Sequence, residues 1–95
     1  MTMKLKELLE GLSKGNSNQY ATLSARFVDK SGRTCDFSYK GFPLMVATLL
    51  AIVPVEILKK NVIDFNVNVG NKRERYGVNH CGEIVKVAFD IIIEF

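Results

Sequence analysis

The chain has 95 residues, of which 47% are hydrophobic and 24% are charged, and its formal net charge is +3. A single domain of this length, 1–95, leaves a large share of its surface in water, so its core is sufficient but small. The composition excludes intrinsic disorder and an acidic mimic of DNA, and it lacks the large basic surplus of a dedicated nucleic-acid binder.

Cysteine content and hydropathy indicate the cellular compartment of the protein. Cys35 and Cys81 are too few for a disulfide framework, and Lys4 interrupts the apolar region that a signal peptide would need. The longest apolar stretch, 42–55, is shorter than the roughly 20 residues that cross a bilayer, and it contains Pro54. We therefore expect a cytoplasmic protein with reduced thiols and no membrane partner.

The first predicted element is an amphipathic helix over residues 3–14. Leucines recur at the i, i+3, i+4, i+7 spacing of one helix face, namely Leu5, Leu8, Leu9 and Leu12. Thr2 is suited to cap the start of this helix, and Gly15 is suited to end it.

A β-hairpin follows, because the hydrophobic period changes to two over 20–27 and again over 34–39. The sequence 29–32 is a good hairpin turn, with Gly32 able to take a positive φ. One face of the hairpin is apolar, and its members are Ala21, Leu23, Ala25, Phe27, Cys35, Phe37 and Tyr39. We expect this face to press against the core.

The second helical region, 43–60, is interrupted by Pro54. Residues 44–53 are apolar nearly all round, so we expect this helix to be the most buried element. At Pro54 either the helix kinks or a second short helix begins. A continuous helix would set strand 62–69 parallel to strand 33–39, whereas a true break would permit a wholly antiparallel sheet; we favour the mixed sheet.

Two further strands alternate at 62–69 and at 83–95. The expected core positions are Ile63, Phe65, Val67, Val69, Val85, Val87, Phe89, Ile91, Ile93 and Phe95. The last strand is apolar on its other face too, so it should be central in the sheet or meet a partner chain. The sequence thus predicts an α+β fold in the order α-β-β-α-β-β, a four-stranded sheet, mixed or antiparallel, with two main helices packed on it.

No grouping of residues indicates catalysis, a metal site or a cofactor. His80 and Cys81 are adjacent in a loop and point apart, and the ligand spacings of zinc motifs are missing. The glycines of 11–17 end a helix rather than begin one, which is the wrong context for a phosphate-binding loop. We therefore predict that the protein is not an enzyme and carries neither metal nor cofactor.

The best functional candidate is the predicted loop 70–82, which is long for a compact domain. It brings three cations next to an aromatic residue, namely Lys72, Arg73, Arg75 and Tyr76. Arginine and tyrosine anchor many protein interfaces, but a charged hairpin tip is also commonly an inert, solvated end. The residue types do not decide between a contact site and an inert tip.

The composition and the missing catalytic grouping favour a small non-enzymatic protein-binding module. Chains of this kind are typical of phage and mobile-element inhibitors of host defence systems, such as anti-CRISPR proteins. The alternative is a weakly basic nucleic-acid-binding protein, with Lys30 and Arg33 at the first hairpin tip joining the cations of 70–82. A wholly antiparallel sheet would bring the two tips together, whereas a parallel crossover would split them. Pairing of an open edge or of residues 84–92 would also allow a homodimer.

Overall fold

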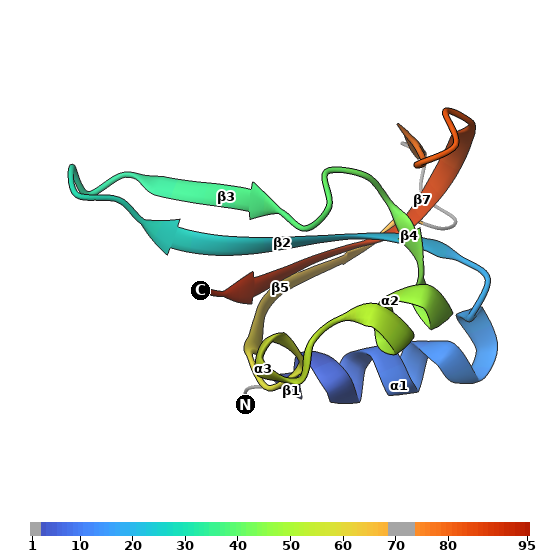
Figure 1. Ribbon diagram of the computed structural model, residues 1–95, viewed down its shortest axis with the longest axis horizontal. Coiled ribbons are helices and arrows are strands. Elements are labelled where there is room, and N and C mark those ends of the chain that lie inside the picture. The colour runs from blue at the N-terminus through green and yellow to red at the C-terminus, as the bar shows by residue number, and fades with distance from the viewer. Residues whose placement is uncertain (1–2, 69–73) are drawn as a thin grey trace.

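The computed structural model describes residues 3–68 and 74–95. In these stretches a layer of helices packs against one face of a mixed β-sheet (Figure 1). In chain order the elements are β1 (Met3–Lys4), α1 (Leu5–Asn16), β2 (Tyr20–Val28), β3 (Thr34–Ser38), β4 (Leu44–Met45), α2 (Val46–Ile52), α3 (Val55–Leu58), β5 (Asn61–Val67), β6 (Arg75–Val78) and β7 (Ile84–Glu94). The α+β class that the sequence predicts is confirmed.

The sheet has the strand order β1-β5-β7-β2-β3, with β4 beside β2 and β6 beside β7. Strands β2 and β7 are parallel, and the other described pairings are antiparallel. The predicted strands correspond to β2, β3, β5 and β7, and β7 is central as expected. The prediction of a four-stranded sheet is incomplete, because β1, β4 and β6 are too short to show a period; β6 lies inside the predicted loop 70–82.

Pro54 separates two helices. Val53 is extended, with φ −65° and ψ 127°, and Pro54 is the residue that precedes α3. Proline lacks an N–H and disfavours a helical conformation in the residue before it. The predicted second short helix is therefore confirmed, and a continuous helix over 43–60 is wrong.

The break at Pro54 does not reverse the chain, since α3 continues along the sheet from α2 (Figure 1). Strands β5 and β3 run in the same direction, because each is antiparallel to one member of the parallel pair β7 and β2. The predicted mixed sheet is thus confirmed, and the expected link between a break and an antiparallel sheet is wrong. Lys30 and Arg33 lie at one end of the sheet and Arg75 lies at the other.

The core lies between the helices and the sheet. Helix α1 contributes Leu5 and Leu9, both completely buried, and α2 contributes Val46 and Leu49. The sheet contributes the buried residues Ala21, Leu23, Ala88, Phe89, Ile91 and Ile93. Helix α1 starts later than predicted and runs past Gly15, so the predicted cap at Gly15 is wrong.

Helix α2 is covered on one side only. Val46 and Leu49 face the core, whereas Ala47, Ala51 and Ile52 are exposed. The prediction that this helix is the most buried element is therefore wrong, because strand β7 contributes more buried residues, namely Val87, Ala88, Phe89, Ile91 and Ile93. None of the helices in the described stretches is both long and apolar enough to span a membrane.

Two bulges change the predicted faces of the strands. Tyr20 pairs with Val87 while Ala21 pairs with Phe89, so Ala88 is an extra residue in β7. A second irregularity lies at Ile63, between the pairs formed by its neighbours with β7. Each extra residue moves the following side chains to the other face. The side chains of Val87 and Phe89 therefore lie on opposite faces of the sheet, not on the same face as predicted. Ile63 is 47% exposed instead of buried.

Candidate binding site

The hairpin formed by the end of β2 and by β3, residues 25–38, projects beyond the helices and is called the wing (Figure 1). Its turn is held by Asp29, whose Oδ1 accepts hydrogen bonds from the backbone N–H groups of Ser31 and Arg33, both at 2.9 Å. Gly32 takes the positive φ, 84°, that the turn requires. The hydrogen bonds from Ser31 and Arg33 hold the pKa of the Asp29 carboxyl below its usual range. The predicted hairpin is confirmed.

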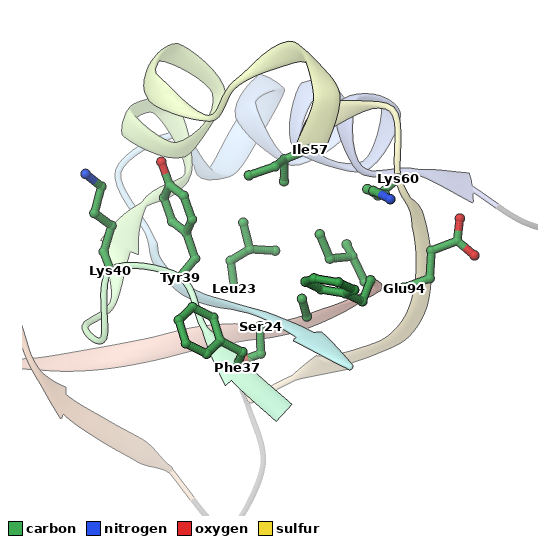
Figure 2. Close-up of a pocket in the computed structure, with 11 residues that line it drawn as sticks. Leu23, Ser24, Phe37, Tyr39, Lys40, Ile57, Lys60 and Glu94 are labelled. Atoms are coloured by element: carbon green, nitrogen blue, oxygen red, sulfur yellow. The ribbon is translucent and has the colours of Figure 1, made fainter. Parts of the chain in front are cut away.

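A cavity of about 330 Å³, called the groove, lies where the wing leaves the helices (Figure 2). Its walls come from β2, β3, α3 and the end of β7. The apolar members of the lining are Leu23, Ala25, Phe37, Tyr39, Ile57, Ile93 and Phe95. Helix α3 reaches the groove only through Ile57, because it has four residues and ends at Leu58. The sheet extends beyond the layer that covers it, and the groove is the gap that results.

The groove exposes large aromatic side chains. Phe37 is 68% exposed and Phe95 is 78% exposed, and the ring of Phe95 packs at 5.5 Å from that of Phe27. The pairing of Phe37 with Ala25 places it on the helix side of the sheet, as the alternation predicts. The expected burial of Phe37 is wrong, because no described element covers this part of the face. Exposed apolar clusters of this kind commonly mark interaction sites.

Lys40 and Lys60 lie at opposite ends of the groove, and Glu94 lies near Lys60 (Figure 2). The ammonium of Lys40 is 5.8 Å from the centroid of the Tyr39 ring. The ion pairs found within residues 3–68 and 74–95 involve neither lysine. Both cations are therefore free to meet an acidic group on a partner.

The opposite, open face of the sheet carries a polar cluster around Asp90. The carboxylate accepts hydrogen bonds from Thr22 Oγ1 at 2.5 Å and from Asn68 Nδ2 at 2.9 Å, and it pairs with Arg75 Nε at 2.8 Å. Its side chain is only 17% exposed. Thr22, Asn68 and Arg75 thus all contact the Asp90 carboxylate. A buried charge with its hydrogen bonds satisfied in this way is typical of a network that stabilises the fold.

The second carboxylate near this cluster is also neutralised. Arg26 donates to both oxygens of Asp36, at 2.8 and 3.2 Å. The hydrogen bond from Arg26 lowers the pKa of Asp36, and the same bond raises the pKa of the guanidinium. Since Asp36 and Asp90 are each paired with an arginine, they do not form the pair of differently tuned acids that general acid–base catalysis needs.

The predicted contact residues Lys72 and Arg73 lie outside the described residues. Arg75 starts β6 and pairs with Asp90, as above. Tyr76 is 60% exposed, and its hydroxyl donates to Glu74 at 2.6 Å. The hydrogen bond from Tyr76, with that of a neighbouring lysine, lowers the pKa of Glu74. Arg75 and Tyr76 are thus engaged within the molecule, and their role as a contact site stays a prediction.

The thiols and the histidine do not form a cluster in the part of the chain that the structure describes. His80 and Cys81 are exposed in the turn before β7, where the His80 ring lies 5.8 Å from that of Phe42. Cys35 is half-buried on the wing rather than in the core. Among the described residues no three His, Cys, Asp or Glu side chains gather closely enough to hold a metal ion.

The groove was not predicted from the sequence, although one feature of the sequence indicates it. Strand β2 has nine residues, whereas the helix that should cover its far end is cut short at Pro54. A long strand beside an interrupted helix indicates that part of the sheet stays uncovered. The contributions of Ile57 and Lys60 depend on how α3 is placed, which no local pattern reveals.

Comparison of the chain with known protein families, with curated proteins and with solved structures finds no match. The site is therefore interpreted from its own geometry and chemistry.

Proposed function

We propose that the chain is a non-enzymatic protein-binding module whose contact surface is the groove. The observation that carries the proposal is the exposure of Phe37, 68%, on the wall of an apolar cavity. Covering apolar surface contributes about 25 cal/mol per Å², and aromatic side chains are frequent anchors of interfaces. A partner that fills the groove would gain this term without rearranging the core.

The charges beside the groove support a partner segment of defined chemistry. The walls are apolar, whereas Lys40 and Lys60 stand at the two ends. A peptide segment with apolar side chains at its centre and carboxylates on both sides matches this distribution. Glu94 near Lys60 adds one repulsive contact, so the Lys40 end provides the stronger electrostatic attraction.

Single-stranded nucleic acid is the second candidate, and the same exposed rings favour it. Proteins that bind single strands stack bases on aromatic side chains beside cations, and Phe37, Tyr39 and Lys40 offer both. Two observations make single-stranded nucleic acid less favoured than a protein partner. The cations Lys30 and Arg33 lie at the end of the sheet opposite Arg75, and Glu94 would repel a phosphate.

A narrower assignment follows from composition rather than geometry. An inhibitor of a host defence system, such as an anti-CRISPR protein, would bind one defence protein and block its contacts. This assignment stays a prediction. Expression of the chain in cells that carry an active defence system should restore phage infection, and unchanged resistance across such systems would contradict it.

Affinity capture from the source cell, with and without nuclease, tests the main proposal. Phe37→Ser removes a groove wall, and Val28→Ser is the matched control, because Val28 is 67% exposed but does not line the groove. We expect a nuclease-resistant protein partner that Phe37→Ser loses and Val28→Ser retains. Capture that persists in Phe37→Ser would remove the groove as the site, and loss with nuclease would favour nucleic acid.

The predicted contact residues need a separate variant in the same assay. Replacing Lys72, Arg73 and Arg75 together by alanine should weaken capture if this region is the contact site. Because Arg75 pairs with Asp90, the change is expected to lower stability somewhat, so folding is checked by circular dichroism. Unaltered capture would discard these residues.

A further inference from the structure

The outer edge of the wing is a regular strand that no other strand within residues 3–68 and 74–95 pairs with. The register pairs Ser24 with Ser38 and Val28 with Thr34, and no bulge interrupts it. The hydrogen bonds at its two ends, Tyr39 N–H to Leu23 O and Asp29 N–H to Arg33 O, show which residues bond β2. Antiparallel ladders alternate, so the backbone groups of Thr34, Asp36 and Ser38 point away from β2. In the described part of the chain no strand pairs with them.

This edge lacks the protection that natural sheets usually have. Exposed edges are commonly blocked by proline, lysine, a bulge or a very short strand. At the other edge of the sheet β1 has only two residues. Strand β3 has five, and its sequence, Thr-Cys-Asp-Phe-Ser, contains neither proline nor lysine; its one charged residue, Asp36, is paired with Arg26. The edge is therefore competent to add a strand.

We propose that β3 pairs with β3 of a second copy of this chain, antiparallel and with the two-fold axis at Asp36. In this register Asp36 lies opposite Asp36, Thr34 opposite Ser38, and Cys35 opposite Phe37. Every outward N–H and C=O of Thr34, Asp36 and Ser38 then gains a partner on both copies. Two-fold dimers are the commonest closed homo-oligomers, and a pairing of identical edges is an isologous contact of this kind.

The charges on the open face are compatible with this register. The two copies of Asp36 face one another across the axis, but in each copy Arg26 donates hydrogen bonds to both carboxylate oxygens of Asp36. The row across the interface is then Arg26, Asp36, Asp36 and Arg26, with a balanced charge. Arg26 and Asp36 are partly exposed, at 36% and 45%, so solvent also screens the repulsion.

On the groove side the pairing covers Phe37. An aromatic side chain buries about 150–250 Å² when fully covered, and Phe37 is 68% exposed in the single copy. A stable interface buries about 800 Å² on each partner, which a five-residue edge does not reach alone. We therefore expect a weak dimer, with a dissociation constant on the order of hundreds of micromolar, rather than an obligate one.

The dimer would also change what the protein can bind. A two-fold axis perpendicular to the sheet keeps both grooves on the same side of the joined sheet. A partner with two matching segments would then gain from effective concentration. Phe37 belongs to both the paired edge and the groove wall, so capture through the groove is measured at low micromolar concentration, where the chain is expected to be a monomer.

Disulfide cross-linking tests the register directly. In a Cys35→Ser, Cys81→Ser background, Asp36→Cys places two thiols opposite each other at the axis, within the Cα separation that a disulfide spans. Thr34→Cys is the matched control on the same strand and face, but its two copies lie far from the axis on opposite sides. We expect mild oxidation to link Asp36→Cys and not Thr34→Cys. Equal linking of both, or of neither, would overturn the register.

Sedimentation velocity of the unmodified chain tests the dimer itself. Asp36→Pro removes an outward N–H and leaves the ladder to β2 intact, so it should fold and remain monomeric. We expect the wild type to shift towards a dimer at several hundred micromolar and Asp36→Pro to stay a monomer. A wild type that is monomeric throughout, or an Asp36→Pro variant that still dimerises, would overturn the proposal. Capture of a partner through the groove, measured at low micromolar concentration, would be untouched by either result.

Discussion

The two halves of the sheet carry the same hydrophobic alternation, but the apolar side chains are buried in one half and exposed in the other. In the half covered by α1 and α2, Leu23 is 3% exposed and Ile91 is completely buried. In the wing, Phe37 has the same parity and is 68% exposed. Alternation therefore identifies the face on which a side chain lies, whereas burial depends on whether another element reaches that face.

The difference originates at Pro54. Helix α2 ends at Ile52 and α3 has four residues, so the helical layer stops before the end of β2. Only Ile57 and Lys60 extend from this layer to the groove. Pro54 lacks an N–H and interrupts the helical layer, and this interruption leaves the Phe37 ring in the wing uncovered.

The largest effect is expected in the covered half. Leu49 is 1% exposed within the core, so Leu49→Ala removes buried methyl groups and leaves a cavity. We expect a loss of about 2–5 kcal/mol in the free energy of unfolding, measured by urea denaturation. Ile52→Ala in the same helix is the control, because Ile52 is 45% exposed and should lose much less. Equal losses would mean that α2 is not anchored by one face.

The next effect concerns the reverse side of the covered half. Asp90→Ala leaves donors of Thr22, Asn68 and Arg75 without their acceptor in a half-buried place. We expect a loss of about 1–3 kcal/mol in chemical denaturation. Asp36→Ala on the wing removes a more exposed, solvent-screened ion pair and should cost clearly less than Asp90→Ala. A larger loss for Asp36→Ala would show that the wing, not the Asp90 cluster, carries the stability of the open face.

Features set by local chemistry could be predicted from the sequence. The turn at Asp29 to Gly32 and the break at Pro54 follow from the conformations that glycine and proline allow. The bulge at Ala88 could not be predicted, because an extra residue is defined only against the neighbouring strand. The short strand β6 was missed for the same reason, since four residues show no period.

The candidate site was recognised only in part. The alternation correctly placed Phe37 on the helix side of the sheet but gave no measure of how far the helices extend. The cationic stretch is visible in the sequence as charge, but Arg75 forms an ion pair with Asp90 inside the molecule. That pairing joins residues far apart in the chain, so no local pattern could have revealed it.

Phe37→Ser should barely change the stability of the single copy. Its ring is already largely in water, so the expected change in the free energy of unfolding is about 1 kcal/mol or less. The measurement belongs at low micromolar concentration, where a second copy contributes nothing. Val28→Ser, with similar exposure, should behave alike. A loss comparable to that of Leu49→Ala would show that Phe37 is covered in solution.

The smallest effect is a change in acid sensitivity at the wing turn. Hydrogen bonds from Ser31 and Arg33 lower the pKa of Asp29 in the folded chain. Its carboxylate therefore stabilises the fold above the unfolded pKa of about 3.9, and this contribution is lost as the pH falls through the lower folded value. The second turn achieves the same geometry with Asn79, whose Oδ1 accepts from the backbone of Cys81 at 3.0 Å and of Glu83 at 2.9 Å.

Asp29→Asn converts the first turn into the chemistry of the second. The amide oxygen can still accept both backbone hydrogen bonds, so stability near neutral pH should change little, while the decline in acid should become shallower than in the wild type. It should not vanish, because Asp36 and Glu74 also have lowered pKa values. Denaturation curves between neutral pH and about pH 3 check this. Parallel declines in the two proteins would show that the Asp29 charge contributes nothing, and that the turn depends on acceptor geometry alone.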